Sequence, residues 1–271
     1  GKVPWLKTPN LDRLAKEGAY FENTYVTTAL CSPSRASILT GLYSHTHTVV
    51  DNIAPDPGNL EFFPEYLQQA GYQTSFFGKW HMGGDTDEPR PGFSHWESFK
   101  GQGVYYNPQL NINGKQESYT DSTYITDLLT EHAVDWLAKR DQSKPFFMYL
   151  SHKAVHSEFA PAKRHKGVYK NEPISLPSSF RTSDQQVSGK KRINNDIETE
   201  VNKKEPLKTD TYYGEGRTPD WQKMQRESWH GVDYMYHGQI SFPDFYRSYC
   251  ETLLAVDESV GAVLKYLDDN G

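Results

Sequence analysis

Residues 30–41, LCSPSRASILTG, place a cysteine and an arginine about one helical turn apart at the start of a predicted helix. Ser32 is a candidate N-cap, Pro33 suits the first turn, and the following run continues as helix until a glycine ends it. Cys31 would then stand at a helix N-terminus, where free N–H groups and the helix dipole favour negative charge. Arg35 points near the same place. The pattern predicts a site that holds an anion beside a reactive residue.

Cys31 has two other possible interpretations. A free cysteine near a helix start is often a buried structural residue, and local physics leaves that interpretation open. A cysteine phosphatase loop fits poorly, because that chemistry needs a longer, glycine-bearing loop to wrap N–H groups round a phosphate. Only three residues separate Cys31 from Arg35, and none of them is glycine.

Lys79 and His81 follow a predicted strand in the stretch FFGKWHMG. Two side chains at alternate positions of a strand's end point the same way, so this pair would face one cleft. His156 comes after a second apolar run, and its imidazole suits proton transfer near neutral pH. His152 competes with His156 for that role. Considered alone, Lys79 and His81 are best interpreted as a solvated lysine and a histidine in a turn. Next to Cys31, the same pair indicates a functional site.

Hydrophobic periodicity predicts the elements that would position these residues. Thr8 is a candidate N-cap, Pro9 fits the first helical position, and Gly18 suits the end of the first helix. Asn113 and Gly114 predict a hairpin turn in a glycine-rich stretch that could wall the pocket. The alternation of helix and strand favours a layered α/β fold. The predicted helices are residues 7–18, 32–40, 64–71, 121–140 and 242–271, and the predicted strands lie within 19–26, 72–80 and 144–156.

The composition narrows the classes of partner. A net charge of −6 over 271 residues does not favour a nucleic-acid partner. No apolar run is long enough to span a membrane. Aromatic residues make up 14% of the chain, and Tyr and Trp suit the walls of sugar sites, although most tyrosines are ordinary core or surface residues. Cys31 and Cys250 form no disulfide framework, and whether they pair stays open. Residues 161–243 lack periodicity and predict long loops that face the substrate.

The stretch CSPSRASILTG resembles the signature of the type I sulfatases, which reads Cys-x-Pro-x-Arg followed by a Leu-Thr-Gly helix, and every fixed position is present. The resemblance covers most of residues 3–160 and about 245–271. It implies an alkaline-phosphatase-like α/β sandwich with a central, mostly parallel sheet flanked by helices. Residues 1–271 would then be an incomplete catalytic domain that lacks the first strand and the C-terminal part, and this fragment alone would be inactive.

The same resemblance implies a role for each catalytic candidate. Cys31 would be oxidised to formylglycine, an aldehyde whose hydrate attacks sulfur, and Arg35 would hold the diol in place. Lys79 would bind sulfate oxygens. His81 would take a proton from the diol and later help to expel sulfate. His156 would protonate the leaving alcohol, although Val155 stands where the family usually has a proline, which weakens that part of the match.

Three further histidines are candidates for substrate contacts. The family often has histidines near the substrate mouth after the signature helix, which is where His45 and His47 lie. His230 belongs to the irregular region, and its assignment rests on composition alone.

The family also binds a divalent cation, usually calcium, with magnesium as the alternative. Cys31, as formylglycine, would be one ligand, and the Asp and Asn ligands are expected outside this chain, since oxygen donors suit calcium. Asp269 and Asn270 resemble the late metal motif of the family. They follow a predicted helix instead of a strand, so we interpret them as a helix end that Gly271 closes.

The sequence therefore predicts a sulfuric ester hydrolase that removes sulfate from a sulfated carbohydrate. The implied partners are a sulfated glycan and a formylglycine-generating maturation enzyme. Family habit places such enzymes outside the cytoplasm, in the periplasm, the medium or the lysosome. One alternative is a phosphonate or phosphate ester hydrolase on the same fold; the other is a non-catalytic protein that binds sulfated glycans. The sugar, the position of its ester and the oligomeric state stay open.

Overall fold

The structure is a computed structural model that describes residues 3–54, 57–83, 86–175 and 242–271. It divides into two compact units, Gly1–Lys7 with Val155–Leu254 and Thr8–Ala154 with Ala255–Gly271. The second unit holds a five-stranded sheet in the order β4-β3-β2-β1-β5. The strands are β1 (Gln73–Lys79), β2 (His95–Phe99), β3 (Gln109–Ile112), β4 (Lys115–Ser118) and β5 (Phe146–Ser151).

The sheet is mixed. Strand β1 pairs in parallel with β2 and with β5, so the three strands end at one edge. Strands β3 and β4 form the predicted hairpin and continue the sheet in antiparallel fashion. Asn113 and Gly114 connect them with φ angles of 52° and 87°, the left-handed region that a two-residue turn of this kind requires.

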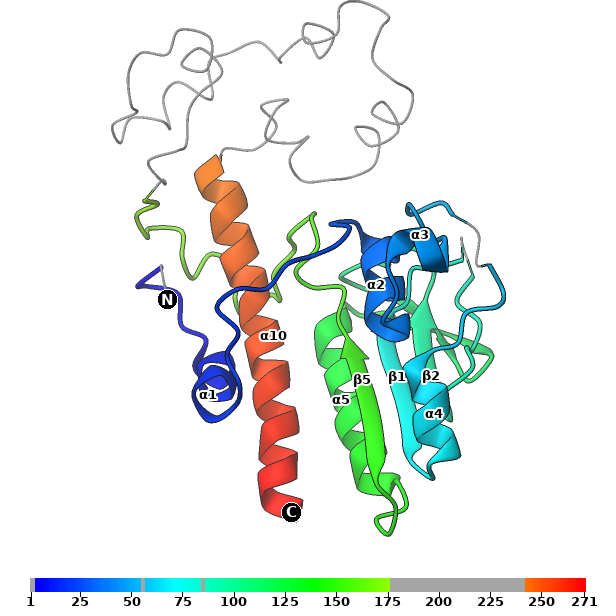
Figure 1. Ribbon diagram of the computed structural model, residues 1–271. Helices are drawn as coiled ribbons and strands as arrows, with labels where there is room; N and C mark the ends of the chain where they lie inside the picture. The colour runs from blue at the N-terminus through cyan, green and yellow to red at the C-terminus, as the bar shows by residue number, and fades with distance from the viewer. Residues whose placement is uncertain (1–2, 55–56, 84–85, 176–241) are drawn as a thin grey trace, which may run out of the picture. The chain divides into compact units, whose positions relative to one another are not determined.

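Helices cover both faces of the parallel strands. Figure 1 shows α2 (Cys31–Thr40) and α4 (Phe63–Gln69) on one side of β1, β2 and β5, with α5 (Ile125–Lys139) on the other. The C-terminal part of α10 (Phe242–Asn270) packs beside α5, where Tyr266 donates a hydrogen bond to the Leu137 carbonyl at 2.9 Å. The remaining helices are α1 (Pro9–Glu17) and the short α3 (Ser44–His47). The predicted helices and two of the three predicted strands are confirmed.

One predicted strand is wrong. Residues 19–26 form no strand, and their large side chains lie exposed, with Tyr25 at 88% and Phe21 at 76%. Alternation of apolar side chains makes a strand only where a neighbouring strand pairs with it, and none of the described strands pairs with this segment.

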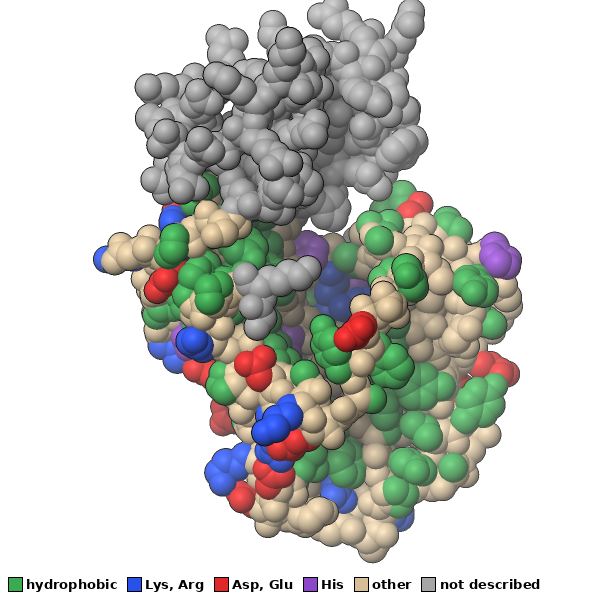
Figure 2. Space-filling model, turned by 60° about the vertical axis from the view of Figure 1, so that its left-hand side comes forward, with side chains coloured by type: hydrophobic (Ala, Val, Ile, Leu, Met, Phe, Trp, Pro, Cys, Tyr) green, Lys and Arg blue, Asp and Glu red, His purple; other side chains and the backbone are tan. Residues whose placement is uncertain are grey.

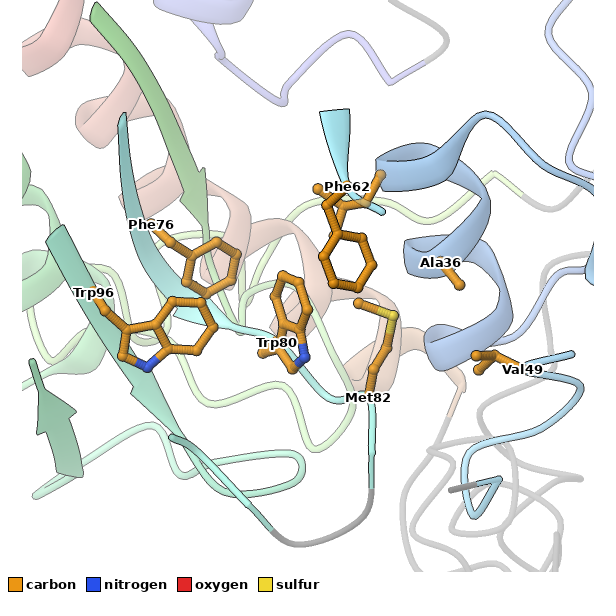
Figure 3. Packing of buried hydrophobic residues seen from close by; sticks show 8 residues of the cluster. Ala36, Val49, Phe62, Phe76, Trp80, Met82 and Trp96 are labelled. Atoms are coloured by element: carbon orange, nitrogen blue, oxygen red, sulfur yellow. The ribbon is translucent and has the colours of Figure 1, made fainter. Parts of the chain in front are cut away.

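The core on the α2 side of the sheet is mainly aromatic. Phe76 of β1 stacks on Trp96 of β2 with ring centroids 4.7 Å apart, and Trp80 meets Phe62 edge-on at 5.2 Å (Figure 3). Offset and edge-to-face contacts of this kind stabilise a core beyond the area they bury. The cluster holds α2 against the ends of the parallel strands, which fixes where Cys31 lies relative to β1.

The Asp-Asn-Gly sequence at the end of the chain is a helix end, as predicted. Asp269 pairs with Lys265 at 2.7 Å, one turn earlier, and the Asn270 amide donates to the Tyr266 carbonyl at 2.7 Å. Gly271 has a φ of 90° and donates its N–H to the Leu267 carbonyl, a glycine C-terminal stop.

Charged side chains of both signs intermingle on the face drawn in Figure 2. Arg13 on α1 forms two ion pairs, one with Glu17 on the same helix and one with Asp268 on α10. No helix within the described residues is both long and apolar enough to cross a membrane.

The first compact unit contains described residues on both sides of the long loop region. Trp5 packs against Tyr169 with ring centroids 4.8 Å apart, and Glu251 accepts the backbone N–H groups of Gly167 and Tyr169. Residues 161–175 form turns and irregular backbone. Most of the predicted loop region, residues 176–241, lies outside the described residues, so its substrate-facing role stays a prediction.

Gly78 is expected to tolerate no side chain. It has a φ of 112°, and a Cβ built on it would lie 2.0 Å from the Ser151 carbonyl oxygen on β5. We expect Gly78→Ala to lower the free energy of unfolding by at least about 2 kcal/mol, since strand pairing would have to open. The control is Gly71→Ala, where φ is 89° but no atom lies within 4 Å. That change should cost about 1 kcal/mol, for backbone strain alone. Equal losses in urea unfolding would contradict the steric argument.

A buried carboxylate between two histidines predicts a pH dependence of stability. Glu97 on β2 is 4% exposed and accepts hydrogen bonds from His95 at 2.8 Å and His132 at 2.7 Å. Burial raises the pKa of Glu97, but the hydrogen bonds from both histidines outweigh it and leave the pKa lowered. The hydrogen bond with Glu97 raises the pKa of His132.

The pKa shifts of Glu97 and His132 affect stability on opposite sides of its pH profile. A lowered glutamate pKa contributes stability that is present above the unfolded value of about 4.3 and is lost as pH falls. A raised histidine pKa contributes stability that is present below about pH 6.5 and is lost as pH rises through the folded value. We expect the contribution of the pair to be largest between about pH 4.5 and 6.5. In urea unfolding, His132→Gln should flatten the alkaline limb, and an unchanged slope would refute the assignment.

Candidate active site

Cys31 is the first residue of α2, and the preceding Leu30 has the extended backbone of an N-cap position. The helix therefore begins two residues earlier than a Ser32 cap would require. Ser32 is buried and acts differently: its hydroxyl donates to the His81 carbonyl, and its N–H donates to the Asn52 side-chain oxygen at 3.0 Å. The bond to His81 ties the first turn of α2 to the segment after β1, and the bond to Asn52 ties it to the loop after α3, so Cys31 is held beside the end of β1.

Lys79, the last residue of β1, points at Cys31. Its side chain is almost completely buried, and its Nζ lies 3.5 Å from the Cys31 Sγ. The strand places it there because β1 ends at the edge where β2 and β5 also end. Ligand sites of parallel α/β sheets form at this edge, beyond the carboxyl ends of the strands.

Arg35 joins α2 to two of these strand ends. Its Nη1 donates to the Lys79 carbonyl and, at 2.8 Å, to the Ser151 hydroxyl at the end of β5. Ser151 in turn donates to the Lys79 carbonyl at 3.0 Å. The guanidinium also lies within electrostatic range of Cys31. Arg35 thus holds α2 against the ends of β1 and β5, and it also adds a positive charge to the site.

His81 completes the group around Cys31. Its side chain lies close enough to the cysteine to lower the pKa of the thiol, and its backbone has a φ of 54°, an uncommon conformation for a residue with a side chain. Its Nδ1 is buried and has no hydrogen-bond partner within the described residues. The structure therefore brings together four of the five catalytic candidates of the sequence, Cys31, Arg35, Lys79 and His81.

The charges around Cys31 change its acidity. Burial raises the pKa of the thiol, but the neighbouring His81 and the positive charge of Lys79 lower it to about 6. Burial lowers the pKa of Lys79 to about 8, against the opposing effect of Cys31. The site favours an anion at the position of the Cys31 side chain, as a helix N-terminus with adjacent cations should.

Two further residues at this edge were not among the site candidates of the sequence. Gln102, in the turn after β2, accepts a hydrogen bond from the Lys79 Nζ through its side-chain oxygen. Lys153, 7% exposed, donates to the Gln102 backbone carbonyl at 3.2 Å and lies over the Tyr105 ring at 4.8 Å. The sequence signal was the pair of glycines at 101 and 103, which predicted a loop at the pocket without identifying the residue between them.

The predicted substrate histidines differ in their surroundings. His45 is exposed and stacks on Tyr43 with ring centroids 5.8 Å apart, so it stays available for a substrate. His47 is fully buried; its Nδ1 accepts the Val49 N–H and its Nε2 contacts the Ser37 hydroxyl, both at 3.1 Å. Both ring nitrogens are used within the fold, and burial lowers the pKa of His47. The expectation of a substrate contact at His47 is therefore corrected to a structural role.

The remaining candidate histidines are His152, His156 and His230. His230 lies outside the described residues. His156 belongs to the first compact unit, where its Nδ1 contacts the Ser157 carbonyl, so its predicted part in the chemistry stays a prediction. His152 lies 2.8 Å from the Ser259 hydroxyl, and burial lowers its pKa to about 4. A neutral, inward-facing histidine of this kind is a poor proton donor to an alcohol.

The described side chains do not by themselves fit a calcium ion. Around Cys31 they are two lysines, an arginine, a histidine and amides, and calcium needs several carboxylate or carbonyl oxygens. Within the part of the chain that the structure describes, no three His, Cys, Asp or Glu side chains gather as a metal site.

Comparison with known proteins gives one consistent result. The sulfatase family model matches residues 2–271. An N-acetylglucosamine-6-O-sulfatase of Bacteroides thetaiotaomicron is 36% identical over 98% of this chain and 51% of its own length. The N-acetylglucosamine-6-sulfatase of Homo sapiens is 35% identical over 63% of this chain and 34% of its own length.

A solved structure agrees with these relatives. It holds a protein in complex with its substrate D-glucosamine-2-N,6-O-disulfate, and it superposes with a TM-score of 0.69 at 33% identity, over 98% of this chain and 58% of that chain. Its fold is the alkaline-phosphatase-like fold of sulfatases, as the sequence predicted. The chain spans about half the length of the bacterial relative.

Proposed function

Because the chain belongs to the sulfatase family, we propose that the protein to which it contributes hydrolyses sulfate esters of a sulfated carbohydrate. The observation that carries this proposal is the group of cations around Cys31. Lys79 contacts the cysteine side chain, and His81 and Arg35 lie within electrostatic range of it. A sulfate ester brings negative charge to such a site, and more charge collects on its oxygens as the ester bond breaks.

The relatives suggest which sulfate is removed. The bacterial and human relatives are named for the 6-sulfate of N-acetylglucosamine, and the solved structure holds a glucosamine that carries N- and 6-O-sulfates. We propose 6-O-sulfated glucosamine units as the first substrates to test. The exposed pair of Tyr43 and His45 offers an aromatic surface of the kind that suits sugar rings.

Cys31 fits the position of a formylglycine. It stands partly buried at a helix N-terminus, with its side chain within reach of Lys79 and His81. The oxidised residue would supply an aldehyde whose hydrate provides the attacking oxygen. Lys79 would bind the sulfate oxygens, and Arg35 would keep the end of β1 in register with α2. His81 would accept a proton from the residue at position 31, since its side chain lies beside that residue.

The remaining assignments of the proposal rest on family resemblance. His156 would protonate the leaving alcohol. Calcium, or magnesium, would be bound by the residue at position 31 together with ligands from outside the described residues. A formylglycine-generating enzyme would mature Cys31, and the protein would act outside the cytoplasm.

The test uses the full-length protein, produced together with a maturation enzyme. Sulfate release is measured from N-acetylglucosamine 6-sulfate and from the 3-sulfate of the same sugar, beside phosphate release from its 6-phosphate. We expect the highest kcat/KM on the 6-sulfate. Faster release from the phosphate would favour a phosphate or phosphonate ester hydrolase instead. Binding of the 6-sulfate without turnover, by protein in which the maturation of Cys31 has been verified, would favour a non-catalytic protein that binds sulfated glycans.

A further inference from the structure

The turn after β2 has a shape that its glycines impose. Gly101 and Gly103 have φ angles of 54° and 64°, and a Cβ on Gly103 would lie 2.4 Å from the ring of Phe99. The Gly103 N–H donates to the Lys100 carbonyl at 3.1 Å and closes the turn. Gln102 is therefore presented from a fixed backbone instead of a flexible loop.

This turn begins beside Lys79. In the parallel pairing of β1 with β2, Lys79 is the register partner of Phe99, the last residue of β2. The Gln102 side chain reaches back to accept a hydrogen bond from the Lys79 Nζ, the same atom that lies 3.5 Å from the Cys31 Sγ. The Gln102 backbone carbonyl accepts a hydrogen bond from Lys153. One residue thus contacts both buried lysines at this edge of the sheet.

The chemistry of the acceptor decides what this contact does. An ammonium group on a flexible stem has many orientations, and an acceptor on one side restricts them. A carboxylate at this position would form an ion pair with Lys79 and cancel its charge, whereas an amide oxygen orients the ammonium and leaves the charge for another anion.

We propose that Gln102 is a positioning residue that fixes the ammonium of Lys79 over the side chain of residue 31, so that its charge meets an anionic substrate group. This inference rests on the proposed sulfatase function and deepens it. Gln102 acts through Lys79 and need not touch the substrate.

The test measures binding, so that it does not depend on maturation of Cys31. The full-length protein carrying Cys31→Ser is titrated with N-acetylglucosamine 6-sulfate by isothermal titration calorimetry. Gln102→Met removes the side-chain acceptor but keeps the size of the side chain and the backbone contact to Lys153. Combining it with Lys79→Met closes a double-mutant cycle. Gln116→Met is the matched control, because Gln116 donates to Asp87 at 3.1 Å and makes no described contact with Lys79.

We expect Gln102→Met to weaken binding about tenfold, the effect of losing a hydrogen bond to a charged group. In the Lys79→Met background the same change should alter the Kd by no more than about twofold, since the residue through which Gln102 acts is gone. Gln102→Glu keeps an acceptor of the same size and should weaken binding at least as much, because its charge neutralises Lys79 and repels sulfate. The Gln116→Met control should bind like the parent.

Three results would overturn the proposal. The first is a Gln102→Met variant that binds like the parent while Lys79→Met binds weakly. The second is an equal loss in both backgrounds, which would show that Gln102 does not act through Lys79. The third is a Gln102→Glu variant that binds normally; this variant also serves if Gln102→Met fails to fold. A parent protein that binds no sulfated sugar would instead refute the proposed function, and with it the premise of this inference.

Discussion

Replacing Cys31 with alanine is expected to abolish sulfate release, with a fall in kcat on the order of 10³-fold or more, because no other described group at the site can take its place as nucleophile. The fold should survive the change. Cys31 is the first residue of α2, is only partly buried, and alanine is a good helix former. Steady-state rates on a 6-sulfated glucosamine and a thermal unfolding curve test both parts.

Cys250 provides the matched control. It is the other free cysteine of the chain, fully buried in α10, and burial raises the pKa of its thiol to about 11. Cys250→Ala should keep its kcat while losing some thermal stability, which is the reverse of the pattern expected for Cys31→Ala. If Cys31→Ala retained its activity, the nucleophile assignment would have to be abandoned.

Replacing Arg35 with methionine is expected to cost both stability and activity. The change removes the donor to the Lys79 carbonyl and to the Ser151 hydroxyl, and it leaves these partly buried acceptors without their charged partner. Hydrogen bonds from charged groups contribute about 1.5–3 kcal/mol each, so the loss of both should lower the free energy of unfolding by about 3–6 kcal/mol. Because Lys79 moves with the end of β1, kcat/KM should fall on the order of 10²-fold.

Arg13→Met is the control that distinguishes these effects from the loss of an arginine in general. It forms ion pairs with Glu17 and Asp268 on the exposed surface, where water and salt screen the charges. Arg13→Met should leave both urea unfolding and kcat/KM close to the parent values. An Arg35→Met variant that is as stable and as active as Arg13→Met would show that Arg35 does not hold the ends of the strands together.

The parts of the fold that could be predicted from sequence are those whose signals are local. The helix at Pro9–Glu17, the hairpin turn at Asn113 and Gly114, and the long final helix each carry their own capping, turn or periodicity pattern. The segment 19–26 also alternates, but a strand depends on a partner elsewhere in the chain, which alternation alone does not supply.

Whether a site residue could be predicted also depends on how local its sequence signal is. Cys31, Arg35, Lys79 and His81 belong to short motifs, so residue type and spacing, together with the resemblance to the sulfatase signature, identified them. Gln102 was not identified, because its hydrogen bond with Lys79 depends on the parallel register of β1 with β2. No short stretch of sequence encodes that register.

His47 shows the opposite error. A histidine near the signature helix suggested a polar contact with substrate, yet both of its ring nitrogens are used inside the fold. Residue type alone cannot distinguish a ligand histidine from one whose hydrogen bonds are satisfied in the core.

The most direct test of the central claim is the mass of the tryptic peptide that spans Glu17 to Arg35, taken from the full-length protein produced with a formylglycine-generating enzyme. We predict the decrease in mass that accompanies replacement of the Cys31 thiol by an aldehyde. An unmodified thiol, obtained while the maturation enzyme converts a control protein in the same cells, would contradict the proposed mechanism.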